Sequence, residues 1–270
     1  MIQIDSARCI GCGLCADDCF PGAITLADKK AVVSSPENCI GCGHCIAICP
    51  RDAVMDDTLD QADIHPLQVE VEPQKLLGLM RSRRSCRHYT SQPVSAEEKA
   101  ALLEAARACP TAKNLQGTRY IFVEEKIPTL LDAALRALDQ VGQRQLETAT
   151  DPGELRRANN FIAWNQQRQA DKAFDPLFFH APLLMIFVTD QPGARDGAAA
   201  AAYTELMAAS LGLGCLYSGY FTACAAGSAE IQQMLGLAPG EQAVRCLVLG
   251  HPDVKFQRTA PRKKPNIVLM

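Results

Sequence analysis

The chain has 270 residues, of which 48% are hydrophobic and 21% are charged, so it can bury a sizeable core in one large domain or two unequal ones. A net charge of -3 and a sequence pI near 6.0 argue against a nucleic-acid partner, which requires a basic face. The first residues lack the basic and apolar segments of a secretion signal, and the apolar stretch 181–188 is too short to span a bilayer. We therefore expect a cytoplasmic protein that binds neither nucleic acid nor membrane.

Most of the cysteines lie near the start of the chain. Two runs with the spacing C-x2-C-x2-C-x3-C occupy residues 9–19 and 39–49, and the second run ends in Cys49-Pro50. This is the spacing of bacterial ferredoxins that carry two [4Fe–4S] clusters, and without a secretion signal a disulfide framework is not expected. The remaining cysteines share no spacing, and we expect them to be small buried hydrophobic residues: Cys86, Cys109, Cys215, Cys224 and Cys246.

The spacing suits a cubane because three thiolates two residues apart can wrap a loop around three of its corners, while intervening glycines let the backbone approach the sulfides. In two-cluster ferredoxins the fourth cysteine of each run binds the other cluster. This resemblance assigns to the first cluster the ligands Cys9, Cys12, Cys15 and Cys49. It assigns to the second cluster the ligands Cys39, Cys42, Cys45 and Cys19. We expect residues 1–60 to form this domain, with short strands at 23–28 and 30–35 held chiefly by the clusters.

Two other interpretations of the cysteines are less favourable. Zinc sites use C-x2-C pairs, and structural cysteines without chemistry would not repeat the whole pattern. Because all four ligands are supplied for each cluster, we expect His44 to be a solvent-side or hydrogen-bonding residue. Phe20-Pro21 follows Cys19 where the second run has Cys-Pro, so the turns after Cys19 and Cys49 are not expected to be identical.

A linker is expected over residues 61–72, stiffened by Pro66 and Pro73, before a larger domain over 73–270. The pattern of that domain predicts helices at 95–108, where Ser95 and Glu98 form a capping box, and at 128–147, 153–171, 196–212 and 228–236. It predicts strands at 119–125, 183–190 and 243–250. No G-x-G-x-x-G follows any of these strands, which weakens direct use of NAD(P)H without excluding it. The glycines at 212–214 are expected to cap the preceding helix.

Two stretches of this domain allow more than one interpretation. The alanine-rich helix 196–212 is expected to be a packing surface, either across a dimer or inside one subunit. Trp164 and the aromatic stretch 174–180 form either a lid or pocket wall, or simply part of the core.

The stretch LMRSRRSCRHY, residues 79–89, places four arginines within seven residues beside a serine. Arginine suits phosphate because its planar fork donates paired, charge-assisted hydrogen bonds. A solvated basic helix end explains the segment equally well, so the segment alone does not decide between them.

Four segments in order resemble the nitroreductase family. RRSCRHY resembles the family segment R-R-S-x-R-x-[FY], and ACPTAKNLQGTRYIFV, residues 108–123, resembles its P-[ST]-[AS]-x-N-x-Q-P-W loop before a strand. GLGCLYSGYF, residues 212–221, looks like the flavin segment G-x-x-x-C-x-x-G, and residues 249–265 look like the closing G-[HY]-P segment with basic residues. The resemblance covers residues 73–270. This sequence departs from the family at Gln116-Gly117-Thr118, where Gln-Pro-Trp is usual, which leaves the shape of the substrate site open.

The resemblance implies a homodimer of α+β subunits, with one FMN at each subunit interface. The phosphate and ring edge of FMN would be held by Arg83, Arg84, Ser85 and Arg87. The C-terminal segment would add the charges of Arg262 and Lys264. The partner subunit would contribute Pro110, Thr111, Ala112 and Asn114. The flavin N5 and O4 would face the backbone around Tyr217, Ser218 and Gly219.

The two predicted domains together suggest a function. A [4Fe–4S] cluster passes one electron at a time, whereas a flavin collects two and delivers them as a hydride. The hypothesis is an oxidoreductase of an anaerobic host that takes low-potential electrons from an external ferredoxin or similar donor. Clusters and FMN would pass them to a small-molecule acceptor with a nitro group, activated alkene, quinone or similar group. Two alternatives stay open: a non-catalytic electron carrier or redox subunit that serves a protein partner, and an enzyme that modifies flavin. The sequence identifies no catalytic acid.

Overall fold

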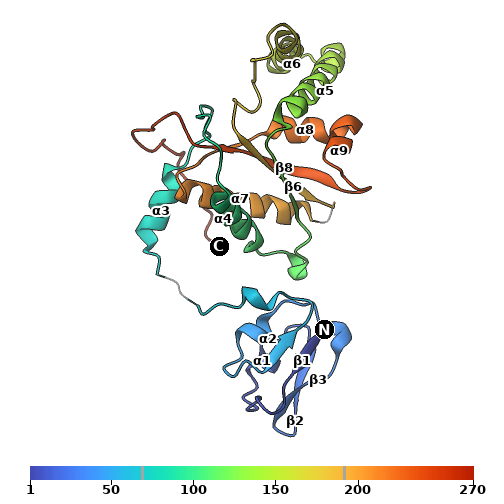
Figure 1. Cartoon of the computed structure of the whole chain (residues 1–270), viewed down its shortest axis with the longest axis vertical. Coiled ribbons are helices and arrows are strands. Elements are labelled where there is room, and N and C mark those ends of the chain that lie inside the picture. The colour runs from blue at the N-terminus through green and yellow to red at the C-terminus, as the bar shows by residue number, and fades with distance from the viewer. Residues whose placement is uncertain (68–69, 191–192) are drawn as a thin grey trace. The chain divides into compact units, whose positions relative to one another are not determined.

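The computed structural model of the chain describes residues 1–67, 70–190 and 193–270 (Figure 1). It divides into two compact units: unit 1 comprises residues 1–70 with 111–116, and unit 2 comprises residues 71–110 with 117–270. Residues 68 and 69 of the predicted linker lie outside the described residues. Pro73, which was expected to stiffen the linker, is instead the first residue of helix α3 (Pro73–Ser82). None of the described helices combines the length and apolar character that crossing a bilayer requires.

Unit 1 is built from two similar halves that interlock. Each half contains one cysteine run and a four-residue helix, α1 (Leu14–Asp17) or α2 (His44–Ala47). Strand β1 (Ile2–Ile4) pairs antiparallel with β4 (Val54–Asp56), and β2 (Ile24–Ala27) pairs antiparallel with β3 (Lys30–Val33). The β1–β4 pair joins the start of the first half to the end of the second. The predicted strands at 23–28 and 30–35 are confirmed, whereas the three-residue strands β1 and β4 were not predicted.

Unit 2 contains a four-stranded antiparallel sheet in the order β5-β6-β8-β7. Its strands are β5 (Arg119–Val123), β6 (Leu183–Thr189), β7 (Gly214–Tyr217) and β8 (Gln242–Gly250). Strand β6 is buried along its whole length because helices cover both faces of the sheet. Leu184 and Ile186 face one cluster of core residues, and Met185 and Phe187 face the other. This double burial explains why β6 is a continuous apolar run rather than an alternating one.

The helices of unit 2 lie in two layers around the sheet. One core cluster joins the sheet to α4 (Ala96–Arg107) and α7 (Ala194–Ser210). The other joins it to α5 (Ile127–Thr148), α6 (Pro152–Ala170), α8 (Gly219–Gly227) and α9 (Ala229–Met234). Figure 1 shows α5 and α6 side by side as a helical hairpin. These layers agree with the predicted α+β class.

Several local predictions are confirmed. Ser95 Oγ accepts from the Glu98 N–H at 3.1 Å, and Glu98 Oε2 accepts from the Ser95 N–H at 2.7 Å, so α4 begins with the expected capping box. Helix α7 ends as expected, because the Leu213 N–H donates to Ala208 O at 2.8 Å beyond Gly212. The buried face of α7 packs on α4 and on the sheet of the same chain.

The close contact between α5 and α6 depends on Gly142. A Cβ atom at this position would lie 2.6 Å from the Ala158 carbonyl oxygen, which is backbone and cannot rotate away. We predict that Gly142→Ala lowers the free energy of unfolding by about 1–3 kcal/mol because the helices must separate. Urea unfolding followed by circular dichroism measures the effect.

The matched control is Gly78→Ala in α3, where a Cβ meets no atom within 4 Å. That change should leave stability unchanged or raise it by up to about 1 kcal/mol, because alanine is the better helix former. Equal effects of the two substitutions would contradict the close-packing explanation.

Candidate functional site

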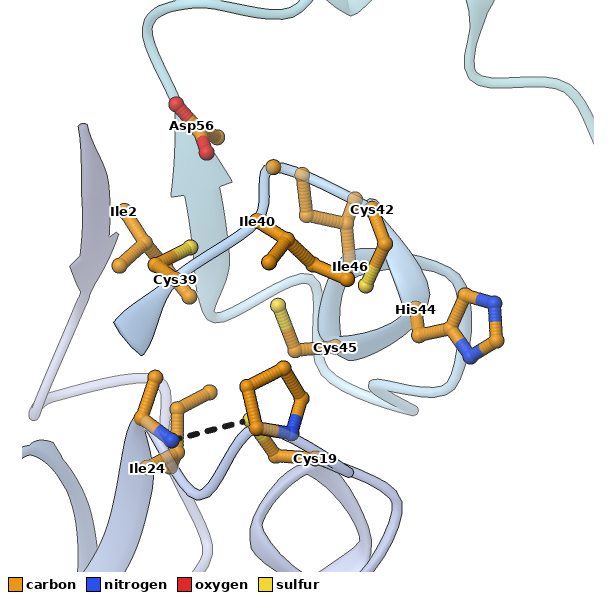
Figure 2. A pocket seen from close by; sticks show the side chains of 14 residues that line it. Ile2, Cys19, Ile24, Cys39, Ile40, Cys42, His44, Cys45, Ile46 and Asp56 are labelled. Atoms are coloured by element: carbon orange, nitrogen blue, oxygen red, sulfur yellow. Dashed lines mark hydrogen bonds between the residues drawn. The ribbon is translucent and has the colours of Figure 1, made fainter. Parts of the chain in front are cut away.

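Two cavities in unit 1 are each surrounded by four cysteines. The first, of about 410 Å³, is shown in Figure 2 and is lined by Cys19, Cys39, Cys42 and Cys45. The second, of about 350 Å³, is lined by Cys9, Cys12, Cys15 and Cys49. Each cavity therefore takes three cysteines from one run and the fourth from the other run. These two sets are the ligand sets that the ferredoxin resemblance assigned to the second and the first cluster.

Backbone N–H groups point at the cysteine sulfur atoms. The Ala23 N–H donates to Cys19 Sγ at 3.3 Å, and the Ala53 N–H donates to Cys49 Sγ at 3.3 Å. The Ala31 N–H donates to Cys9 Sγ at 3.4 Å, and this hydrogen bond lowers the pKa of the Cys9 thiol. Such donors stabilise thiolates, which are the form that binds iron. In the absence of metal, burial raises the pKa of Cys45 to about 11.

The lining of the two cavities fits iron–sulfur clusters. Apart from the cysteines, the walls are largely apolar, with Ile2, Ile24 and Ile46 at the first cavity and Ile4 and Val54 at the second. Among the described residues, no three His, Cys, Asp or Glu side chains converge on a point that would hold a single ion. The thiols surround two larger spaces instead, as the sticks in Figure 2 show for the first cavity.

Two secondary predictions about unit 1 have different outcomes. His44 lies beside the first cavity, but its side chain is 66% exposed and its ring points away from the cysteines toward Asp18 Oδ2 at 3.1 Å, as predicted (Figure 2). The expected difference between the turns after Cys19 and Cys49 is small: both have the same turn assignment, and both place an alanine N–H 3.3 Å from the sulfur. Phe20 does not alter its turn because its side chain is fully exposed.

A third cavity lies in unit 2 and encloses about 1270 Å³, part of which is open to solvent. It is lined by Arg87, Trp164, Pro176, Leu177, Phe179, Leu216, Tyr217, Ser218, Gly219 and Tyr220. The predicted residues Arg87, Tyr217, Ser218 and Gly219 therefore meet at one cavity. Trp164 and the aromatic stretch 174–180 contribute its wall, and they also contact the core.

Local pairing explains how these segments meet. The Cys86 N–H donates to Cys215 O at 3.0 Å, which sets the arginine segment beside β7. The Ser218 N–H donates to Cys246 O at 2.9 Å, which fixes the start of α8 against β8. Because Ser218 is the N-cap of α8, the first-turn N–H groups of this helix lie at the cavity. A helix N-terminus at this place favours electronegative atoms of a bound group.

The other arginines of the segment differ in their surroundings. Arg83 donates from Nη1 to Glu205 Oε1 at 2.5 Å, and the Glu205 side chain is only 11% exposed. Arg84 donates from Nη1 to the Arg83 carbonyl, while its Nη2 is buried with no hydrogen-bond partner. A buried guanidinium N–H without an acceptor fits an incoming anionic oxygen such as that of a phosphate. Ser85 is exposed next to them.

The remaining predicted FMN residues do not line the third cavity among the described residues. Thr111, Ala112 and Asn114 belong to unit 1, where Asn114 Nδ2 donates to Gly41 O at 2.8 Å. Pro110 is the last residue of unit 2 before this segment. Arg262 and Lys264 lie on the exposed segment after β8, which forms neither helix nor strand. Their roles stay predictions.

Glu205 was not predicted as a site residue. Besides pairing with Arg83, its carboxylate acts together with burial to raise the pKa of the Tyr217 hydroxyl. The available signal was a lone carboxylate on the small-residue face of α7, beside Ala201 and Ala208. Burial likewise raises the pKa of the scattered cysteines Cys109, Cys215, Cys224 and Cys246. These four and Cys86 are all buried, as expected of small hydrophobic residues.

Comparison with known families identifies both units. The chain belongs to the nitroreductase family, whose model matches residues 80–251. A model described as 4Fe-4S dicluster domain matches residues 8–53. The predicted fold class is thereby confirmed: a small ferredoxin-like two-cluster domain precedes an α+β nitroreductase-like domain. No curated protein matches the chain.

Several solved structures share the fold. A nitroreductase with bound FMN from Desulfitobacterium hafniense DCB-2 is 24% identical with a TM-score of 0.52, over 72% of this chain and 98% of that one. An FMN-dependent nitroreductase from Clostridium difficile R20291 is 17% identical with a TM-score of 0.53, over 73% and 100%. A BluB-like flavoprotein from Clostridium difficile 630 is 21% identical with a TM-score of 0.54, over 73% and 96%.

The internal repeat offers a matched pair of substitutions at the cysteine loops. Gly11 and Gly41 occupy equivalent places with φ of 69° and 60°, but a Cβ at Gly11 would lie 1.9 Å from Lys29 O, whereas one at Gly41 meets nothing within 4 Å. We predict that Gly11→Ala loses about half of the roughly eight irons that two clusters contain, because its loop must move.

Gly41→Ala carries the same positive-φ strain without the clash and should retain nearly all of its iron. Iron analysis of the two variants, purified anaerobically, measures the difference. Equal iron loss in both variants would show that backbone strain, rather than the contact with Lys29, controls the loop.

Proposed function

We propose that this chain is an FMN-dependent reductase in which two [4Fe–4S] clusters supply the electrons that reduce an organic acceptor. The observation that carries the proposal is the joining of two sites in one chain. A nitroreductase-family unit holds a cavity with Arg87 and the N-terminus of α8, and a second unit surrounds two cavities with four cysteines each. In this proposal residues 1–60 form the cluster domain, 61–72 the linker and 73–270 the FMN domain.

When bound, the clusters carry single electrons and FMN supplies two of them together as a hydride. The residues of the chain bind and orient these groups. The phosphate is held by Arg83, Arg84, Ser85 and Arg87, with Arg262 and Lys264 adding charge. Pro110, Thr111, Ala112 and Asn114 contribute from the partner subunit of a homodimer. The backbone of Tyr217, Ser218 and Gly219 presents N–H groups at the ring. The acceptor gains two electrons from an external ferredoxin or similar low-potential donor and two protons from water.

The walls of the third cavity favour particular acceptors. Arg87 is the one charged residue among the described residues that line it, and the aromatic side chains Trp164, Phe179 and Tyr220 contribute much of the remaining surface. A cation without a facing carboxylate disfavours a positively charged acceptor. Nitro compounds, activated alkenes and quinones are uncharged or anionic, and they suit this lining.

Steady-state turnover tests the proposal. The protein is purified anaerobically, its iron and flavin are quantified, and reduced ferredoxin is supplied together with a nitroarene, a quinone or an enone. The proposal predicts about eight irons and one FMN per chain, many turnovers, and FMN still bound at the end. Protein without flavin contradicts it. Flavin consumed during turnover indicates a flavin-modifying enzyme, and electrons that reach only a protein partner indicate a carrier.

Arg87 offers a direct test of cofactor binding. We predict that Arg87→Ala weakens FMN binding about tenfold or more, because one charge-assisted hydrogen bond at the cavity is lost. Fluorescence titration of the flavin-free protein with FMN measures the dissociation constant.

Arg81→Ala is the control, since Arg81 lies on the exposed last turn of α3 outside the cavity lining. Unchanged FMN affinity in Arg87→Ala, or equal weakening in Arg81→Ala, would remove Arg87 from the proposed site.

A further inference from the structure

A buried arginine ties together three parts of unit 2 near the third cavity. Arg168, near the end of α6, is 6% exposed. Its Nε donates to Asp132 Oδ1 on α5 at 2.7 Å. Its Nη1 donates to the carbonyl oxygens of Lys172 and, at 3.2 Å, of Phe174. The guanidinium therefore fixes the first residues of the chain after α6.

The connection from α6 to β6, residues 171–180, is here called the wall segment. It contains neither helix nor strand, yet it is tightly held. Asp175 accepts hydrogen bonds from three backbone N–H groups, those of Leu177 at 3.2 Å, Phe178 at 2.8 Å and His180 at 2.9 Å. The Phe178 ring is fully buried and packs on Phe221 at a centroid distance of 5.5 Å.

These contacts hold the backbone in an unfavourable conformation. Phe179 and His180 have φ of 55° and 59°, a region that bulky residues rarely adopt. Such strain persists only where the surroundings determine the conformation, and it concentrates at functional sites. The strained Phe179 lies in the lining of the third cavity, with Pro176 and Leu177 beside it.

We propose that the wall segment is a rigid selectivity wall of the third cavity, in which Phe179 determines which acceptors fit. Asp175 and Arg168 are positioning residues: they do not line the cavity, and they act by holding the backbone that presents Phe179. The proposal rests on the proposed function and deepens it. A flexible wall would adapt to any acceptor, whereas a fixed ring excludes those that overlap it, which in apolar pockets changes specificity by about 10–200-fold.

The chain provides its own probe for this wall. Trp164 is the single tryptophan of the sequence, and it lines the same cavity. Binding of 4-nitrobenzoate, which quenches indole fluorescence, can therefore be titrated in the holoprotein without turnover. The FMN content of each variant is measured in parallel.

Asp175→Ala removes all three hydrogen bonds and is expected to raise the dissociation constant of 4-nitrobenzoate and the KM for it about tenfold, with kcat and FMN content changed less than twofold. Asp175→Asn keeps one acceptor oxygen and should restore part of the affinity. The matched control is Asp171→Ala, which removes a hydrogen bond to the Ala173 N–H in the same segment but outside the cavity lining. It should change the dissociation constant less than twofold.

Two further variants test the other named residues. Arg168→Lys keeps the charge but not the fork that reaches Asp132 and two carbonyls, so it should behave like Asp175→Ala. Its control is Arg136→Lys, which alters the exposed pair with Glu230. Phe179→Gly removes the ring and relieves the strain, whereas Phe179→Ala removes only the ring; both should change the order of preference among acceptors of different width.

The outcomes separate the two proposals. Equal effects of Asp175→Ala and Asp171→Ala on 4-nitrobenzoate binding, or an unchanged order of acceptors in both Phe179 variants, would overturn the selectivity wall. Wild-type protein without FMN, or without acceptor turnover, would overturn the proposed function, while the fluorescence titration would still decide whether the wall controls binding.

Discussion

Strand β8 is the element on which the arrangement of unit 2 depends. It pairs with β6 on one side and with β7 on the other, so it lies in the centre of the sheet. Its carbonyl groups also hold the site: Cys246 O accepts from the Ser218 N–H at the start of α8, and Val248 O accepts from the Tyr89 hydroxyl at 3.1 Å. The arginine segment and the N-terminus of α8 therefore reach the third cavity as a consequence of how one strand is paired.

Unit 1 follows a different principle, because its own core is small. Its buried residues are few and include cysteines of both runs beside Ile2, Ile24 and Val54. Each cavity joins a triplet from one half to the fourth cysteine of the other, so a cluster bound there would cross-link the halves in addition to the β1–β4 pair. Metal binding and folding are coupled in domains of this kind. The polypeptide contributes the N–H groups that face the thiolates, and the cluster contributes stability that the apolar core lacks.

Much of this architecture could be predicted from sequence because the signals were local. The cysteine spacing, the Ser95–Glu98 capping box and the continuous apolar run of β6 each depend on residues close together in the chain. Strand β7 and helix α8 were missed because β7 has four residues and α8 is apolar around much of its circumference, without a helical stripe. Glu205 and the wall segment were beyond sequence analysis, since their roles arise from contacts with Arg83 and Arg168 that only the folded chain creates.

The central claim is that electrons reach the flavin through the cysteine-bound clusters. Rapid anaerobic mixing with reduced ferredoxin measures this directly, by following flavin bleaching in the wild type and in a variant with Cys12 and Cys42 replaced by serine. The account predicts fast bleaching in the wild type, a loss of at least about a hundredfold in the variant, and unchanged bleaching of both by dithionite, because the FMN site lies in the other unit. Equally fast bleaching of the variant by ferredoxin would contradict it.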